Sequence, residues 1–167
     1  PTLIIVPEYK GMVYGDEGIR LVTSAIRRNS PQFLDSHSHH NNLLNNILAK
    51  IDANVAGVDD AVMLDDRGFL AETNATNLFV VRKGVLLTPF AHACLPGLTR
   101  RFVLDVAERV GLDAREADLS LTELYTAEEA FTTGTMGALA HVTEVDGRCI
   151  AGGEKGPVTR RMQQAYE

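Results

Sequence analysis

Short blocks of hydrophobic and polar residues along the chain predict more strands than helices. Apolar runs that are β-branched or alternate with polar residues indicate strands at Thr2–Val6, Ile19–Ile26, Ala61–Leu64, Asn77–Val81, Val85–Thr88, Ala130–Thr133 and Leu139–Val145. The dipeptides Lys83-Gly84 and Asp146-Gly147, and the DDRG sequence at 65–68, are typical of tight turns between strands. The polar stretch Arg27–Ser38, which contains Pro31, predicts a loop.

Two longer segments have the apolar period of a helix. The first begins near Asn41 and stops at Gly57, and its period is carried by Leu44, Leu48, Ile51 and Val55. The second runs from about Thr99 to Val110 and is closed by Gly111.

Two shorter signals predict further helices. Ser120 with Glu123 three residues later is a capping box, and Pro157 suits the first turn of a final helix. Strands outnumber helices, and several are joined by two-residue turns. This mixture predicts an α/β or α+β domain with substantial antiparallel pairing, and not a doubly wound parallel sheet. The glycine-rich signatures of dinucleotide and P-loop sites are absent from the sequence.

Composition narrows the class of protein. A chain of 167 residues with 45% hydrophobic and 23% charged residues is typical of one soluble globular domain. A net charge of −6 argues against nucleic acid or an anionic membrane as the main partner. The sequence shows no signal peptide and no apolar run that could span a bilayer, and its two cysteines form no metal or disulfide pattern. A cytoplasmic location is expected.

The sequence CLPGLTRR, Cys94–Arg101, is the first candidate site. Thr99 follows a glycine at the start of the second predicted helix, where free backbone N–H groups and a hydroxyl favour an anion. Arg100 and Arg101 lie in the first turn, which the helix dipole disfavours unless an anion is bound there. Alternatively, Thr99 only caps the helix and Arg101 pairs with Asp105.

Two other stretches carry suggestive polar groups. FTTGTMGA, Phe131–Ala138, directly follows a predicted strand, and its threonines 132, 133 and 135 and its glycines offer hydroxyls and close backbone approach to a phosphate. Plain loops have the same composition, so this signal is weak alone. Glu72 precedes the polar run TNAT; it is either solvated or paired with a heteroaromatic nitrogen that it keeps protonated.

The sequence FLDSHSHHNN contains three histidines, His37, His39 and His40, at the mouth of the first helix. Imidazoles bind zinc, nickel or copper, but only Asp35 is nearby to complete a ligand set, and the spacing matches no specific metal motif. A solvated loop is therefore favoured over a metal site.

Several segments, in this order, resemble the class IV pyridoxal-phosphate (PLP) aminotransferases of fold type IV, which include branched-chain and D-amino-acid aminotransferases and aminodeoxychorismate lyase. The segments are NNLLNNILAKIDA, AVMLDDRGFLAETNATNLFVV, LLTP, CLPGLTRRFVLDVAERVGL, LSLTELYTAEEAFTTGTMG and GPVTRRMQQAY. The resemblance implies that residues 1–167 are one PLP-binding large domain, a mixed, largely antiparallel, pseudo-barrel-like sheet with packed helices. It further implies that residues 1–16 correspond to the end of the family's small N-terminal domain and the linker that follows it, the rest of that domain being missing.

The resemblance also implies residue roles. Glu72 matches the glutamate that pairs with the pyridine nitrogen of PLP. Leu98 and Thr99 match the phosphate-binding LPG[IL]T turn, and Thr135 matches a second phosphate contact in the TGT turn.

One departure from the family pattern affects the chemistry. Aligned without gaps to the family's DPRIKSLNYLNN, residues 35–46 place His39 where the Schiff-base lysine belongs. Imidazole can relay protons near neutral pH but has no primary amine with which to bind PLP covalently. Lys50, eleven residues farther along the same helix, is about 16 Å away along the axis and cannot substitute.

Intact relatives are expected to transfer an amino group between an amino acid (branched-chain or D) and a 2-oxo acid through PLP. For this chain the resemblance implies a cytoplasmic homodimer. With His39 we expect this chain to bind PLP weakly and non-covalently and to be impaired or inactive. The alternative is a non-catalytic domain that serves as an assembly or regulatory partner.

Overall fold

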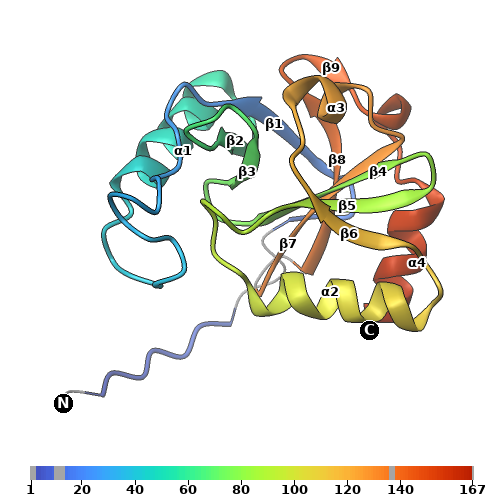
Figure 1. Ribbon diagram of the computed structural model, residues 1–167, viewed down its shortest axis with the longest axis horizontal. Helices are drawn as coiled ribbons and strands as arrows, with labels where there is room; N and C mark the ends of the chain where they lie inside the picture. Colours follow the sequence, from blue (N-terminus) through green and yellow to red (C-terminus); the bar gives the residue numbers. More distant parts are fainter. Residues whose placement is uncertain (1–2, 10–13, 136–137, 167) are drawn as a thin grey trace.

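The computed structural model describes residues 3–9, 14–135 and 138–166, which form a curled nine-stranded sheet with helices on its outside (Figure 1). The strands are β1 (Ile19–Thr23), β2 (Asp60–Leu64), β3 (Leu70–Thr73), β4 (Asn77–Arg82), β5 (Val85–Pro89), β6 (Ala114–Ala117), β7 (Glu129–Gly134), β8 (Ala138–Val145) and β9 (Arg148–Cys149). The helices are α1 (Leu44–Ala56), α2 (Leu98–Arg109), α3 (Leu121–Tyr125), the 3-10 turn η1 (Ala151–Gly153) and α4 (Pro157–Tyr166). No helix in this described part is long and apolar enough to cross a membrane.

The sheet is mixed and mostly antiparallel. Its order is β3-β2-β1-β8-β7-β4-β5-β6, with β9 beside β8. Strand β1 pairs in parallel with β2 and β8, and β5 pairs in parallel with β6, whereas the other pairs are antiparallel. The sheet curls so that β3 comes close to β4 and β5, which makes an open half-barrel. The predicted fold class is confirmed.

Both predicted two-residue hairpin turns are present. Lys83 and Gly84 have φ of 51° and 73°, and Asp146 and Gly147 have φ of 51° and 74°. Two consecutive positive φ values are the signature of the type I′ turn, whose twist matches that of the flanking strands. These turns therefore set the register of the β4–β5 and β8–β9 hairpins.

Most of the core lies in three clusters, and a fourth, small cluster consists of Ala71, Ala93 and Cys94. The inside of the curl is filled mainly by aliphatic side chains of β1, β2, β4 and β8, with Leu124 of α3. On the outer face, α2 and α4 cover β4, β5 and β7, where the rings of Phe79 and Phe131 stack at 5.1 Å. Farther along, α1 packs its buried alanines, Ala49 and Ala53, on Ala61 and Met63 of β2. The half-barrel is thus closed on the outside by helices from both ends of the chain.

Helix α1 forms as predicted but packs through a different face. The apolar residues that predicted it, Leu44, Leu48, Ile51 and Val55, are all exposed, and the smaller alanines lie against the sheet. Gly57 ends the helix in the left-handed conformation, as its position indicated. The capping box of Ser120 and Glu123 is likewise confirmed at the start of α3.

Four strand assignments differ from the pattern-based prediction, and the short strand β9, which was not predicted, is one of them. The strand expected at Thr2–Val6 is wrong: residues 3–6 form no strand and are 74–84% exposed, because no neighbouring strand offers them hydrogen bonds, while Thr2 lies outside the described residues. Conversely, the sequence pattern predicted no strand at the positions of β3 and β6. Strand β6 has the charged residues Arg115 and Glu116 at its centre, which suit an edge strand but give no apolar period.

Candidate ligand-binding site

A cavity of about 640 Å³ lies where three turns of the half-barrel meet. The β3–β4 turn, the turn into α2 and the β7–β8 turn each line it, together with Tyr14 and His39. The lining residues are Tyr14, His39, Glu72, Ala75, Thr76, Asn77, Leu95, Pro96, Gly97, Leu98, Thr99, Thr133, Gly134 and Thr135. All residues that the sequence assigned to a cofactor therefore lie on one cavity.

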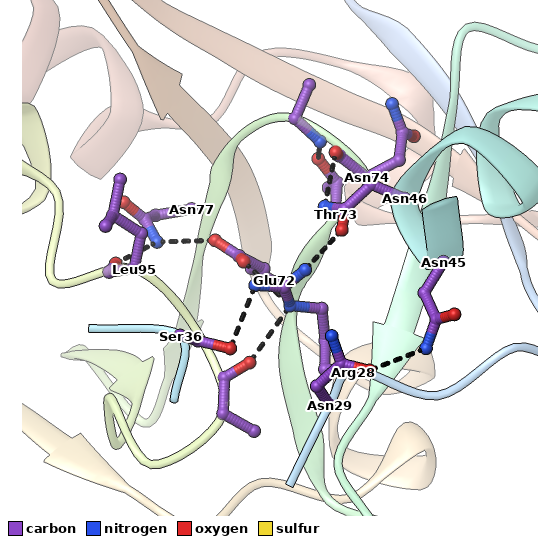
Figure 2. A network of polar contacts seen from close by, with 12 residues as sticks. Arg28, Asn29, Ser36, Asn45, Asn46, Glu72, Thr73, Asn74, Asn77 and Leu95 are labelled. Atoms are coloured by element: carbon purple, nitrogen blue, oxygen red, sulfur yellow. Dashed lines mark hydrogen bonds and ion pairs between the residues drawn. The ribbon is translucent and has the colours of Figure 1, made fainter. Parts of the chain in front are cut away.

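Glu72 is the acidic group of this cavity. Its side chain is buried at the end of β3, with Oε1 3.0 Å from Nε of Arg28, and Oε2 accepts a hydrogen bond from Nδ2 of Asn77 at 3.1 Å (Figure 2). Burial raises the pKa of Glu72 to about 7, and the positive charge of Arg28 opposes that rise. A second cationic group in the cavity would stabilise the ionised carboxylate further. The solvated alternative for Glu72 is wrong.

Arg28 connects Glu72 to the loop before α1 and to α1 itself. Its guanidinium is buried and donates to Oγ of Ser36 at 3.1 Å, to the Ala93 carbonyl at 3.0 Å and to Oδ1 of Asn46 (Figure 2). Sequence reasoning missed Arg28, because a lone arginine in a polar loop has no local signal and its partner lies far along the chain.

No side chain of the described structure caps the first backbone N–H groups of α2. Gly97 is the N-cap, no side chain caps the helix, and Thr99 lines the cavity within the first turn. The alternative in which Thr99 caps the helix is therefore wrong. The first N–H groups of a helix have no intrahelical acceptor and suit an anion. A Cβ on Gly97 would lie 2.4 Å from Oδ1 of Asn77, so only glycine lets this turn approach Asn77 so closely.

The two arginines of this helix do not serve the cavity. Arg100 is buried and does not line it, but pairs with Glu116 and donates to the Pro89 carbonyl at 2.8 Å, while its charge helps to lower the pKa of Glu72. Arg101 is exposed, and no ion pair between it and Asp105 occurs in the described structure. Because Glu116 neutralises Arg100, the arginines give no argument for a bound anion; the free N–H groups and Thr99 do.

The β7–β8 turn supplies hydroxyl groups. Thr133 Oγ1 is buried, lines the cavity, and has no hydrogen-bond partner among the described residues. Such orphan groups are rare in native proteins and call for a ligand or water. Thr135 also lines the cavity and is exposed, whereas Thr132 is buried away from it. Met136 and Gly137, which belong to the same predicted motif, lie outside the described residues.

The histidines do not form a cluster. His39 lies at the rim of the main cavity and of a smaller one of about 120 Å³ beside it. His37 contacts Oδ1 of Asp35 through Nδ1 at 2.8 Å, and His40 Nδ1 accepts the Asn42 amide at 3.1 Å. Over the described ranges, no three His, Cys, Asp or Glu side chains come together as a metal site. The described residues therefore give no support to a metal site at the three histidines.

No lysine of the described chain lines either cavity. Lys50 instead donates to the Asp59 carbonyl and lies 3.2 Å from Oδ1 of Asp60. Tyr14 does reach the main cavity, but its hydroxyl donates to Oδ2 of Asp60, and burial raises its pKa above the usual value of 10. Neither group is a free nucleophile in the site.

The chain is similar in sequence to proteins named as aminotransferases or aminotransferase-like proteins. The family model for amino-transferase class IV matches residues 2–145. Branched-chain-amino-acid aminotransferase-like protein 2 of Arabidopsis thaliana is 56% identical over 99% of this chain, which covers 30% of that protein. A putative branched-chain-amino-acid aminotransferase of Methanocaldococcus jannaschii is 39% identical, with 100% of this chain and 58% of that protein covered. The chain therefore spans only part of the length of these relatives.

Solved structures agree with the fold. The branched-chain aminotransferase of Escherichia coli superposes with a TM-score of 0.87 at 36% identity, covering 90% of this chain and 51% of that one. A T.th. branched-chain aminotransferase complexed with N-(5'-phosphopyridoxyl)-L-glutamate has a TM-score of 0.86 at 35% identity, covering 90% and 51%. Because the family model covers most of the sequence and these structures share its half-barrel, the chain belongs to the class IV aminotransferases.

Proposed function

We propose that this chain is a PLP-binding domain of the class IV aminotransferase fold that holds its cofactor without a covalent bond and does not transaminate on its own. The observation that carries the proposal is the composition of the cavity: Glu72, the free N-terminus of α2 and the unpaired hydroxyl of Thr133 converge there. His39, and no described lysine, lies at its rim.

The cavity fits a phosphorylated pyridine. Glu72 would hold a protonated ring nitrogen, and the buried pair with Arg28 keeps its carboxylate oriented. The phosphate would be held by the backbone of Leu98 and Thr99 and by the hydroxyls of Thr133 and Thr135. When bound, PLP supplies a cationic ring that withdraws electrons from the α-carbon of an amino acid.

The relatives support the substrate class. Proteins named branched-chain-amino-acid aminotransferases are 36–39% identical to this chain over its length, and one solved relative is complexed with a phosphopyridoxyl derivative of glutamate. We therefore propose branched-chain amino acids and 2-oxo acids as the substrates of related proteins in which this site is complete.

The proposed loss of activity rests on the chemistry of His39. Imidazole accepts and donates protons near neutral pH, so His39 is able to relay a proton at the cavity rim. It has no primary amine, so it provides neither the covalent attachment nor the amine base that class IV enzymes have at this position. The expected outcome is cofactor binding without turnover.

Borohydride reduction tests this proposal. We expect PLP to bind with a change in its visible absorbance, to be removed by dialysis, and to leave no mass adduct on the native chain after borohydride reduction. The His39→Lys variant is expected to gain one phosphopyridoxyl adduct, located by peptide mapping. His40→Lys, one residue away on the same loop, is the matched control and should gain none. An adduct on a cavity residue of the native chain would contradict the proposal.

A second function is favoured by the exposed face of α1. A domain that lost its catalytic lysine but kept its fold is suited to a role as an assembly partner. Light scattering of the chain mixed with a full-length class IV enzyme would test this, and two separate species at every ratio would speak against it.

A further inference from the structure

Asn46, in the first turn of α1, reaches from the helix to the surroundings of the ligand cavity. It lies three residues before Ala49, on the side of the helix that packs against β2 through Ala49 and Ala53. Its side chain is half-buried and lines the smaller of the two cavities. Both ends of its amide are used, because Oδ1 accepts a hydrogen bond from Arg28 and Nδ2 donates to the Asn74 carbonyl at 2.8 Å (Figure 2).

The guanidinium of Arg28 has a partner on each of its three nitrogens. Nε lies 3.0 Å from Oε1 of Glu72 and donates to the Ala93 carbonyl at 3.0 Å. Nη2 donates to Oγ of Ser36 at 3.1 Å, and Nη1 donates to Asn46. Because the guanidinium is planar and rigid, the partners of Nη1 and Nη2 set the direction in which Nε points. Of these two partners, Ser36 lies in a loop and Asn46 on a helix, which fixes a side chain more precisely.

The other end of the Asn46 amide holds the turn that follows Glu72. Its acceptor, the Asn74 carbonyl, lies at the start of the β3–β4 turn, and the next two residues, Ala75 and Thr76, line the main cavity. The side chain of Asn74 is itself bound to β2 by two hydrogen bonds, at 2.7 and 3.1 Å. The single amide of Asn46 therefore links α1 both to the partner of Glu72 and to the wall of the cavity.

The chemistry of the two partners fixes which way this amide points. A guanidinium only donates hydrogen bonds and a backbone carbonyl only accepts them, so Oδ1 has to face Arg28 and Nδ2 has to face Asn74. An aspartate at position 46 would offer no donor to the carbonyl, and an alanine would offer neither group. The two contacts together therefore require a side-chain amide at this position.

We propose that Asn46 is a positioning residue of the ligand cavity, which holds Arg28 against Glu72 and fixes the turn that follows Glu72. Asn46 is not among the described residues that line the main cavity, so it acts there through Arg28 and through the turn. Its loss would free the guanidinium to turn away from the Glu72 carboxylate. The consequence for a bound cofactor rests on the proposed function, whereas the consequence for Glu72 itself does not.

Asn45, the preceding residue of α1, provides a matched control. It is half-buried like Asn46, and its Nδ2 also makes two hydrogen bonds, to the Arg27 carbonyl at 3.0 Å and to Oδ1 of Asn29 at 2.9 Å. Neither Asn45 nor these two partners are among the described residues that line the two cavities. Asn45→Ala and Asn46→Ala each lose two hydrogen bonds, so we expect similar losses in the free energy of unfolding. A difference between them at the cavity is then not an effect of stability.

The first measurement compares the dissociation constants of PLP and 1-deazapyridoxal 5'-phosphate, whose ring has a C–H group in place of the nitrogen. We expect the native chain to prefer PLP, because the analogue has no ring nitrogen to bond to Glu72. Asn46→Ala should reduce this preference about tenfold, and Asn45→Ala should keep it. If Asn46 acted only on stability, Asn46→Ala would weaken both ligands equally; an unchanged preference would therefore overturn the proposal.

The second measurement is a carboxyl NMR titration without any ligand, with the Glu72 signal assigned by its loss in Glu72→Gln. Burial raises the pKa of Glu72 to about 7, and the positive charges of Arg28 and Arg100 oppose that rise. A guanidinium that Asn46 no longer holds in place opposes it less. We therefore expect the pKa of Glu72 to rise above about 7 in Asn46→Ala and to stay unchanged in Asn45→Ala.

The two measurements separate a failure of this proposal from a failure of the proposed function. If the native chain binds neither PLP nor the analogue, the proposed function fails, and the titration alone decides the role of Asn46. An unchanged pKa of Glu72 in Asn46→Ala would refute that role in every case. If Asn46→Ala does not fold, Asn46→Gln takes its place: it keeps both amide groups but moves them by one methylene, and it should change the preference and the pKa in the same directions.

Discussion

Two buried glutamates of this protein have opposite surroundings. Glu129, at the start of β7, is 5% exposed and accepts three hydrogen bonds at 2.7–2.9 Å, from the amides of Val158 and Thr159 and from the hydroxyl of Thr159. Glu72, at the end of β3, is 6% exposed and is held by Arg28 and Asn77 beside a cavity of about 640 Å³.

The difference separates a carboxylate enclosed by the fold from one that faces a cavity. Glu129 caps the N-terminus of α4, and the chain closes on it so tightly that a Cβ on Gly156 would lie 2.0 Å from its Cδ. Its contacts leave no room for a ligand. Glu72 instead lines a cavity and carries a raised pKa, because burial penalises its charge more than its protein partners compensate for it.

The largest expected effect is on Glu129. Glu129→Ala leaves two helix N–H groups and a hydroxyl unsatisfied, so we expect the free energy of unfolding to fall by about 4 kcal/mol. Urea unfolding followed by circular dichroism measures this. Glu128→Ala, an exposed neighbour that binds the amides of the β4–β5 turn, should cost less than about 1 kcal/mol. Equal losses for the two variants would end the assignment of Glu129 as the structural carboxylate.

The raised pKa of Glu72 should make the free energy of unfolding depend on pH. Burial raises its pKa from 4.5 to about 7, so between these values the native state binds more protons than the unfolded state. Stability conferred by the protonated group is therefore lost as pH rises through this window. Relative to Glu72→Gln, the native chain should lose about 2 to 3 kcal/mol between about pH 5 and pH 8, measured by urea unfolding. A pH-independent difference would mean that Arg28 keeps Glu72 ionised throughout.

Gly97, in the turn into α2, lies against Asn77, which donates a hydrogen bond to Glu72. In Gly97→Ala the new methyl group would push Asn77 away, which we expect to cost about 2 kcal/mol of stability and to weaken PLP binding. Chemical unfolding and a PLP titration monitored by absorbance report the two effects. Gly15→Ala is the control, because its Cβ would meet only the Glu17 amide at 4.0 Å, and it should change neither value measurably. Unchanged PLP affinity in Gly97→Ala would separate this turn from the site.

The smallest effects concern two buried threonines. Thr159→Val removes a hydrogen bond to Glu129 and should cost about 1 kcal/mol of stability, whereas Thr133→Val removes an unsatisfied hydroxyl and should cost nothing or stabilise by up to about 1 kcal/mol. Thermal unfolding with and without PLP distinguishes them: the shift produced by PLP should shrink only in Thr133→Val. If the shift produced by PLP shrank only in Thr159→Val, the PLP site would lie at Glu129 and not at Glu72.

Much of the fold was predictable because its signals are local. The period of α1 and α2, the capping box at Ser120 and the two type I′ turns depend on residues a few positions apart. The order of short motifs also sufficed to identify the family. The β3 and β6 strands were missed because short strands at the two ends of the sheet have no apolar period of their own.

Which groups share the cavity depends on the way the chain folds. The pair of Arg28 and Glu72, the free N-terminus of α2 and the unpaired hydroxyl of Thr133 belong to segments far apart in the sequence, so nothing local predicts that they share a cavity. That α1 is a helix follows from its residues alone, because periodicity is a property of one segment. Which face of α1 packs inward, and that residues 3–6 form no strand, depends on the partner that the fold provides.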